Sequence, residues 1–195
     1  MSKLIIGATY YQQLEQVELL LLSMSQQTND NWELHILSNG DESVYKIHDE
    51  YPHLCSGNVF LHCSKENTGN WGVYNRIQFV KEAAKRNPTS YVTTTSSEDY
   101  YVPTFVESVL KHDTDMVYWD FVTHTFEYKT IQATCRPWRT KIDWGCFAVK
   151  ANKMSFPEKT EEIEAYIADG LTAERLVRQQ KLETMHIPSV LFIKN

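Results

Sequence analysis

Two adjacent carboxylates, Glu98 and Asp99, are the side chains of this sequence best suited to chemistry. They follow the β-branched run VTTT at residues 92–95, which is typical of a half-buried strand, and Pro103 marks the start of the next expected helix. In open α/β sheets, ligands bind beyond the carboxyl ends of the strands. Two carboxylates held there suit a hard divalent cation that carries phosphates. The same acids could equally be solvated side chains of a turn, so the pair alone leaves both interpretations open.

Alternating apolar runs and helical patterns predict the elements that position these acids. We expect strands at residues 4–6, 32–37, 59–62, 91–95, 115–121, 143–149 and 187–193. We expect a turn at 7–11, then helices at 12–26, 42–51, about 73–86, 103–111, 160–167 and 173–181. Asp169 and Gly170 should form a turn, with Thr172 capping the last helix. Strand, helix and strand joined by short turns predict a right-handed βαβ unit and a parallel sheet, whereas residues 122–141 show no clear pattern.

Composition narrows the class of protein. The 195 residues, 42% of them hydrophobic, are enough for one globular domain with a real core. A formal net charge of −6 argues against a general nucleic-acid-binding protein. No apolar run is long enough for a transmembrane segment, and the N-terminus lacks the features of a signal peptide. Four cysteines without CxxC spacing are more typical of free thiols than of zinc ligands or disulfides, and we expect a cytoplasmic protein.

Four segments together resemble the GT-A glycosyltransferases, in particular the large family 2 group. They are LIIGATYY at residues 4–11, WELHILSNG at 32–40, YVTTTSSEDYYVP at 91–103 and HIPSVLF at 186–192. Each motif alone is weak, but their order and spacing span nearly the whole chain. The resemblance implies an α/β fold: a single GT-A (nucleotide-diphospho-sugar transferase) domain over residues 1–195, with a mixed, mostly parallel sheet flanked by helices.

The resemblance places Thr9 and Tyr10 beside the nucleotide of a nucleotide-sugar donor. Asn39 matches a position where the family often has an Asp that reads the base edge, and Asp41 is the next acid that could substitute. A Tyr ring can stack on a base, and an amide both donates and accepts hydrogen bonds. The alternatives are that Tyr10 is a packing aromatic and that Asn39 is an ordinary turn residue before a glycine.

The turn at residues 67–72 and the helix after it resemble the segment that faces the donor diphosphate. Gly72, Asn75 and Arg76 would then line the diphosphate site at the start of a helix. The alternative for Arg76 is an exposed helix residue without a partner. Trp144, and also Trp138, could offer an aromatic platform for the sugar, although either could equally belong to the core.

The resemblance assigns Glu98 and Asp99 to a metal site for Mn²⁺ or Mg²⁺. The sequence departs from the family's Asp-Ser-Asp-Asp pattern, because Ser96 replaces the first Asp and Glu98 the second. Asp169 matches the catalytic base of the inverting members. Its preceding residue is Ala168 where the family usually has Glu. The alternative for Asp169 is a simple turn residue before Gly170.

The implied activity is transfer of a sugar from a nucleotide-sugar, expected to be a UDP-sugar, to an acceptor hydroxyl with inversion at the sugar carbon. The acceptor, whether glycan, lipid or protein, is not indicated. A nucleotidyltransferase would need a glycine-rich basic loop after the first strand, and residues 7–11 contain one glycine and no lysine or arginine. The alternative function is a catalytically inactive GT-A-like domain that binds a nucleotide or glycan, which the Ser96 and Ala168 departures favour.

Overall fold

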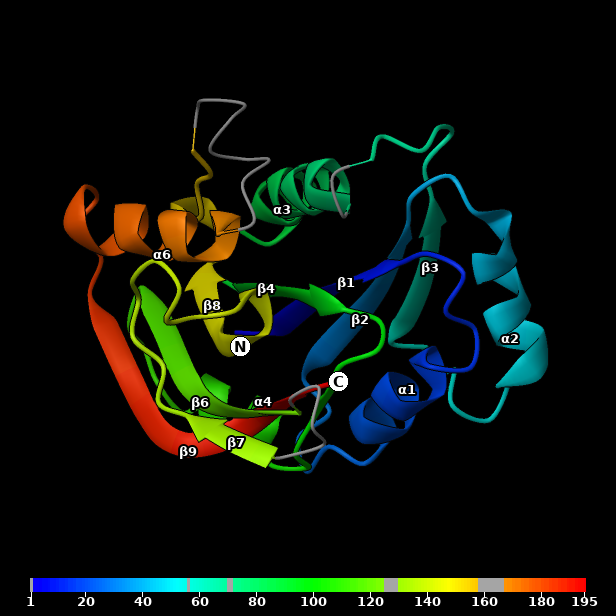
Figure 1. Ribbon diagram of the computed structural model, residues 1–195, viewed down its shortest axis with the longest axis horizontal. Coiled ribbons are helices and arrows are strands. Elements are labelled where there is room, and N and C mark those ends of the chain that lie inside the picture. Colours follow the sequence, from blue (N-terminus) through cyan, green and yellow to red (C-terminus); the bar gives the residue numbers. More distant parts are fainter. Residues whose placement is uncertain (1, 56, 70–71, 125–129, 158–166) are drawn as a thin grey trace.

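The computed structural model describes residues 2–55, 57–69, 72–124, 130–157 and 167–195, and its strands form one mixed sheet (Figure 1). The strand order is β3-β2-β1-β4-β8-β6-β9-β5, and β7 pairs with β6. The strands are β1 Leu4–Tyr10, β2 Trp32–Ser38, β3 Val59–Cys63, β4 Tyr91–Ser96, β5 Tyr100–Tyr101, β6 Met116–His124, β7 Thr130–Ala133, β8 Phe147–Lys150 and β9 Thr184–Lys194. The helices are α1 Val17–Ser25, α2 Ile47–Glu50, α3 Val73–Arg86, α4 Phe105–Leu110 and α6 Ala168–Arg178, with short 3₁₀ helices η1 Glu42–Lys46, η3 Trp144–Cys146 and η4 Ala151–Lys153.

The first four strands of the order run parallel, which confirms the predicted parallel unit. β1 lies between β2 and β4, and its residue Thr9 is in register with Leu37 on one side and Ser96 on the other. The carboxyl ends of these strands therefore open on the same edge of the sheet. This edge carries the segment with Glu98 and Asp99, as the sequence predicts.

The second half of the sheet is mixed. β8 runs antiparallel to both β4 and β6, β6 runs parallel to β9, and β9 is antiparallel to β5. The sequence gives no local signal for the two-residue strand β5 or for β7, which lies within the segment that showed no pattern. These pairings return the end of β9 to the neighbourhood of β4.

Helices cover both faces of the sheet (Figure 1). Strand alternation divides the apolar residues of β1: Leu4, Ile6 and Ala8 join the core cluster that includes α1 and α4. Ile5 faces the other way and packs in the cluster that contains Phe79 and Val80 of α3. Figure 1 shows α3 and α6 along one side of the sheet and α1 along the other. Burial of these faces positions α3, whose first turns approach the carboxyl edge.

Several expected boundaries are wrong, and each has a local physical reason. β1 continues through Tyr10 instead of turning at residue 7, because Ala8 to Tyr10 still pair with β2. Residues 12–16 are not helical, since Gln12 has a positive φ of 53°, and α1 begins at Val17. Strand β8 begins at Phe147 rather than at residue 143. Asp143 instead caps η3 by accepting a hydrogen bond from the Gly145 N–H.

The expected turn at Asp169 and Gly170 is also wrong. Both residues lie in the first turn of α6, which begins at Ala168 and ends at Arg178. Thr172 is buried inside this helix and is not its cap. The expected helix at 160–167 falls almost entirely outside the described residues. Among the described helices, none combines the length and apolarity that crossing a membrane requires.

The start of β4 is tied to the chain before β6 by one buried hydroxyl. The Tyr91 hydroxyl donates to the Thr114 carbonyl at 2.7 Å and accepts from the Thr114 N–H at 3.1 Å. Tyr91→Phe would leave both backbone groups unpaired in the interior. We expect the free energy of unfolding to fall by about 1–3 kcal/mol.

Urea denaturation measures this loss, and Tyr45→Phe is the matched control because the Tyr45 ring is 52% exposed. A Tyr91→Phe protein as stable as the control would contradict this role for the hydroxyl.

Candidate functional site

Two clefts meet at the carboxyl edge of β1 and β4. The smaller cleft, of about 460 Å³, is lined by Thr9, Tyr10, Tyr11, Gln13, Asn39, Asn67, Gly69, Gly72, Arg76, Ser96 and Glu98. The larger cleft, of about 640 Å³, lies toward β9 and α6 and includes Asp99, Asp143, Trp144, Asp169 and Lys194 in its lining. Arg76, Ser96 and Glu98 line both clefts. A ligand with two parts could therefore occupy both clefts and cross at Arg76.

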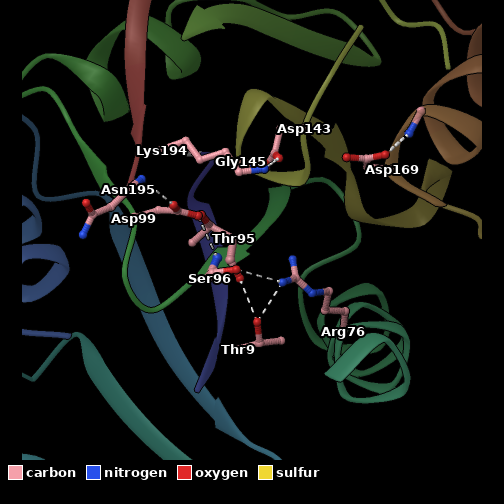
Figure 2. Close-up of polar contacts among 11 residues, drawn as sticks. Thr9, Arg76, Thr95, Ser96, Asp99, Asp143, Gly145, Asp169, Lys194 and Asn195 are labelled. Carbon is pink, nitrogen blue, oxygen red and sulfur yellow. Dashed lines mark hydrogen bonds and ion pairs between the residues drawn. The ribbon is translucent and has the colours of Figure 1, made fainter. Parts of the chain in front are cut away.

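Arg76 is a buried cation at this junction (Figure 2). Its side chain is 4% exposed and reaches from α3 to the ends of β1 and β4. One terminal nitrogen donates to the Thr9 hydroxyl at 2.7 Å and to the Ser96 hydroxyl at 3.4 Å. Nε and Nη1 have no hydrogen-bond partner among the described residues. Burial lowers the pKa of Arg76, but nearby carboxylates including Asp143 oppose this effect, and a guanidinium stays charged in a protein.

Asp99 is held tightly at the end of β4. Its carboxylate is 3% exposed. Oδ2 accepts from the Thr95 hydroxyl at 3.0 Å and from the Ser96 N–H at 3.2 Å, and Oδ1 accepts from the Asn195 N–H at 3.2 Å. Burial, followed by the charges of Asp143 and Glu98, raises the pKa of Asp99 to about 7. The carboxylate is thus largely used in tying the end of β9 to β4.

Asp143 and Lys194 form an ion pair on the rim of the larger cleft, and Figure 2 draws both beside Asp99. The Asp143 carboxylate also accepts from the Gly145 N–H at 3.1 Å, which fixes its orientation. Burial alone would lower the pKa of Lys194. Burial is the largest single effect, but the charge of Asp143, its hydrogen bond and the charges of Asp99 and Asp169 together outweigh it. The pKa of Lys194 therefore lies above its usual value. Lys194 is therefore a permanent cation in the cleft.

Asp169 enters the larger cleft from the first turn of α6. The Gly170 N–H donates to its Oδ1 at 2.6 Å. Burial is the main cause that raises the pKa of Asp169 to about 6, and the charge of Asp143 adds to it. A carboxylate with this pKa can accept a proton near neutral pH, as a general base must.

The structure gathers most of the predicted site residues at the two clefts. Thr9, Gly72, Arg76 and Glu98 line the smaller cleft, and Trp144, Asp99 and Asp169 line the larger one. The Trp144 ring lies 5.8 Å from the Arg76 guanidinium carbon. Trp138 instead lies under Arg178 and is in the lining of neither cleft.

Asn75 is not at the clefts. Its side chain donates to the Ser38 carbonyl at 3.1 Å and lines a separate groove that contains His35 and His62. Asp41 is also absent from both linings. Its carboxylate accepts from the N–H groups of Ser43 and Gln12, so it caps η1 and holds the turn after β1. Neither residue is placed to contact a ligand that lies in the clefts.

Tyr10 and Asn39 border the smaller cleft but are engaged elsewhere. Tyr10 is 1% exposed, and its hydroxyl pairs with Ser43 at 2.9 Å, so its ring has no free face for a base. The Asn39 amide donates to Asn67 at 2.8 Å and to Gly69 at 3.4 Å. Its oxygen accepts from the N–H and the hydroxyl of Thr68, both at 3.0 Å. Asn39 therefore holds the turn at residues 67–69, with no capacity left for a base edge.

Sequence reasoning missed three residues of the clefts. Tyr11, 50% exposed, presents an open aromatic ring in the smaller cleft. Strict strand alternation would have found it, since a buried Tyr10 turns its neighbour outward. Lys194 and Asp143 lie 51 residues apart, and no local pattern joins them.

The donor set at the junction does not fit a divalent cation. Ser96 offers a hydroxyl that already accepts from Arg76, and both Asp99 oxygens already accept hydrogen bonds. Glu98 accepts from the side-chain amide of Gln13. Across the described ranges, no group of three or more His, Cys, Asp or Glu side chains is placed to hold a metal ion. The assignment of Glu98 and Asp99 as a metal pair is therefore not supported by their surroundings.

Comparison with solved structures identifies the fold. TarS of S. aureus matches with a TM-score of 0.74 at 13% identity, over 99% of this chain and 36% of that chain. A TarS fragment in complex with UDP-GlcNAc matches with a TM-score of 0.71 at 12% identity, over 98% of this chain and 58% of the fragment. The mannosyltransferase PcManGT from Pyrobaculum calidifontis, in complex with GDP-Man and Mn²⁺, matches with a TM-score of 0.65 at 14% identity. That match covers 98% of this chain and 56% of PcManGT.

These similarities confirm the predicted α/β GT-A fold. The chain spans between about a third and three fifths of the structures named above. No protein-family model matches the sequence, and no curated protein matches it either. At such low identity the structures establish the fold alone.

All hydrogen-bonding groups of the Asn39 amide are engaged, so a substitution at this residue tests its structural role. Asn39→Asp introduces the acid that GT-A family 2 sequences often have at this position, but it removes the two N–H donors to Asn67 and Gly69. We expect the free energy of unfolding to fall by about 1–3 kcal/mol. Residue 39 is only 7% exposed, and an Asp there would face the Asn67 and Gly69 oxygens without a hydrogen to donate.

The measurement is the midpoint of chemical denaturation at pH 7. Asn58→Asp is the control, since that amide makes one long contact of 3.4 Å at the surface. An Asn39→Asp protein that is as stable as this control and binds UDP more tightly would show that residue 39 reads the base.

Proposed function

We propose that the protein is a glycosyltransferase that moves a sugar from a nucleotide-sugar to an acceptor hydroxyl. The observation that carries this proposal is the junction of the two clefts at Arg76, with Asp169 in the larger one. A nucleotide-sugar has the matching order of parts: a nucleoside, a diphosphate and a sugar. The likeness to TarS and PcManGT, solved with UDP-GlcNAc and GDP-Man, supports the same class of substrate.

The nucleoside would lie in the smaller cleft and the diphosphate at Arg76. Tyr11 offers an exposed ring on which a base can stack. Gly72 has a φ of 70°, and a Cβ there would lie 2.9 Å from Thr9 Cγ2. A side chain at position 72 would therefore strain the backbone and crowd Thr9 at this edge of the cleft. We take the nucleotide to be UDP, as the resemblance implies.

The reaction would be a single displacement with inversion. Asp169 takes the proton from the acceptor hydroxyl, and that oxygen bonds to the anomeric carbon of the sugar. The bond from this carbon to the diphosphate oxygen breaks, and the nucleoside diphosphate leaves with the electron pair. Arg76 stabilises the charge that develops on the diphosphate. The resemblance implies Mn²⁺ or Mg²⁺ as cofactor, but the donor set does not fit one, and no step here depends on it.

A second candidate function is a catalytically inactive domain that binds a nucleotide or glycan. The specific observations that favour it are Ser96 and Ala168, which replace two acids of the family pattern. Release of UDP from a nucleotide-sugar separates the two functions. An enzyme turns over slowly even with water as acceptor, whereas an inactive domain binds without turnover.

Replacing the proposed base tests the enzyme directly. A thermal-shift screen of nucleotide-sugars first identifies the substrate, and release of nucleoside diphosphate then gives kcat. Asp169→Asn should lower kcat by about 10²–10⁴-fold, because an amide cannot accept the proton. Binding of UDP should stay unchanged, since the residue faces the sugar side.

Asp113→Asn is the control, because Asp113 is an exposed aspartate that pairs with Lys150 away from the clefts. If Asp169→Asn retained the wild-type kcat, Asp169 would not be the base.

The pH dependence of the wild-type reaction gives an independent prediction. The free protein's base must be deprotonated, and the pKa of Asp169 is about 6. We expect kcat/KM to be constant above about pH 7 and to fall tenfold per pH unit well below pH 6. The acid limb measured between pH 4.5 and 8 checks this. A limb at the ordinary aspartate pKa, near 4, would mean that the environment of Asp169 does not act as described.

A further inference from the structure

We infer that two side-chain cations, Arg76 and Lys194, hold the diphosphate of the nucleotide-sugar in place of a divalent metal ion. This inference rests on the proposed function and adds to it the way in which the diphosphate charge is neutralised. It also gives Lys194 a role that sequence reasoning missed. Nucleotide binding should therefore need no metal.

The Arg76 guanidinium is the first of the two cations. It donates to the Ser96 hydroxyl, and Ser96 stands where the family pattern has its first acid. A positive group thus sits at the residue that would otherwise bind a cation. Because Nε and Nη1 are buried without a partner among the described residues, the guanidinium has unused donors. Two oxygens of a phosphate group can accept hydrogen bonds side by side from such donors.

The ammonium of Lys194 is the second cation, at the opposite rim. Lys194 comes from the end of β9 and pairs with Asp143, while Asp99 and Asp169 lie close enough to raise its pKa. A positive charge surrounded by carboxylates is the arrangement that a bound metal ion would have. The Lys194 side chain is 43% exposed, so its ammonium can turn from Asp143 toward a phosphate.

Both carboxylate oxygens of Asp99 already accept hydrogen bonds. The Thr95 hydroxyl and the Ser96 N–H already bind one of its oxygens, and the Asn195 N–H binds the other. These three contacts use most of the roughly four lone-pair sites of the carboxylate, in a side chain that is almost fully buried. The contact with Asn195 also places the residue next to Lys194 against the metal-motif segment, so one linkage both engages Asp99 and positions the lysine.

The experiment is calorimetry of the full chain with UDP and, separately, with pyrophosphate, each in EDTA and in 1 mM MnCl₂. We expect UDP to bind in EDTA with a Kd within about threefold of that in MnCl₂. Lys194→Ala should weaken UDP and pyrophosphate binding at least tenfold in EDTA, and Lys194→Arg should restore most of it. Manganese alone should give no saturable binding to the wild type.

Lys153→Ala is the matched control. Lys153 is 47% exposed and lies 3.9 Å from Asp115, so it is a lysine of similar exposure beside an aspartate outside the clefts. Its replacement should leave the Kd for UDP unchanged. The melting temperature of each variant shows whether it is folded.

Each contrary result has its own meaning. If UDP binds the wild type only with MnCl₂, the inference that the diphosphate is held without a metal ion is wrong, and the proposed function stands. If UDP binds in EDTA and a folded Lys194→Ala protein binds it as tightly as the wild type does, the role of Lys194 is wrong. If neither UDP nor pyrophosphate binds under either condition, the inference and the proposed function both fail.

Discussion

The buried guanidinium of Arg76 is the constraint on which the arrangement of the clefts depends. It crosses from α3 to the ends of β1 and β4, where it donates to Thr9 and Ser96. Each buried donor left unpaired costs about 1–3 kcal/mol. The packing of α3 against the sheet must offset that cost, and burying Phe79 and Val80 contributes about 1.5–3 kcal/mol each. The core under α3 therefore stabilises a charge that the helix itself does not satisfy.

The position of α3 follows from the residues beneath it. Gly7 in the middle of β1 has no Cβ, and the Phe79 ring lies in the space that a Cβ would fill. The helix can thus approach the strand closely, and Arg76, one turn before Phe79, reaches the strand ends. A larger residue at position 7 would move the helix and, with it, the cation. The packing of α3 in the core therefore determines where the charge of Arg76 lies at the edge of the sheet.

The carboxylates around the cleft influence one another through the same low-dielectric surroundings. Burial raises the pKa of both Asp99 and Asp169, and the charge of Asp143 adds to each shift. Asp143 itself is paired with Lys194 and bonded to the Gly145 N–H. Burial is the main cause of both shifts, and Asp143 is the second cause of each. Raised pKa values of buried acids in a cleft are typical of sites that transfer protons.

The sequence predicts the parallel half of the fold well, because each strand there is a short apolar run followed by a helix. The carboxyl edge and the acids at it follow from that topology alone. The burial of the Tyr10 ring and the fully used hydrogen-bonding capacity of the Asn39 amide do not follow from it. Whether Tyr10 faces a ligand depends on where β1 ends, and whether Asn39 is free depends on a turn 28 residues later. Asp143 and Lys194 meet only through pairings of β8, β6 and β9, which leave no signal in the local pattern.

Ser96 and Ala168, the two departures from the GT-A pattern that the sequence resembles, have the same electrostatic effect. Ser96 and Ala168 each remove a negative charge from a region where Glu98, Asp99, Asp143 and Asp169 already gather. Ala168 is 4% exposed, so a carboxylate there would be buried beside Asp169 and would repel it. Ser96 instead accepts a hydrogen bond from the guanidinium. Both changes lower the number of carboxylates that the two side-chain cations must balance. The absence of these two carboxylates is therefore compatible with an active site for an anionic substrate. It does not by itself indicate an inactive domain.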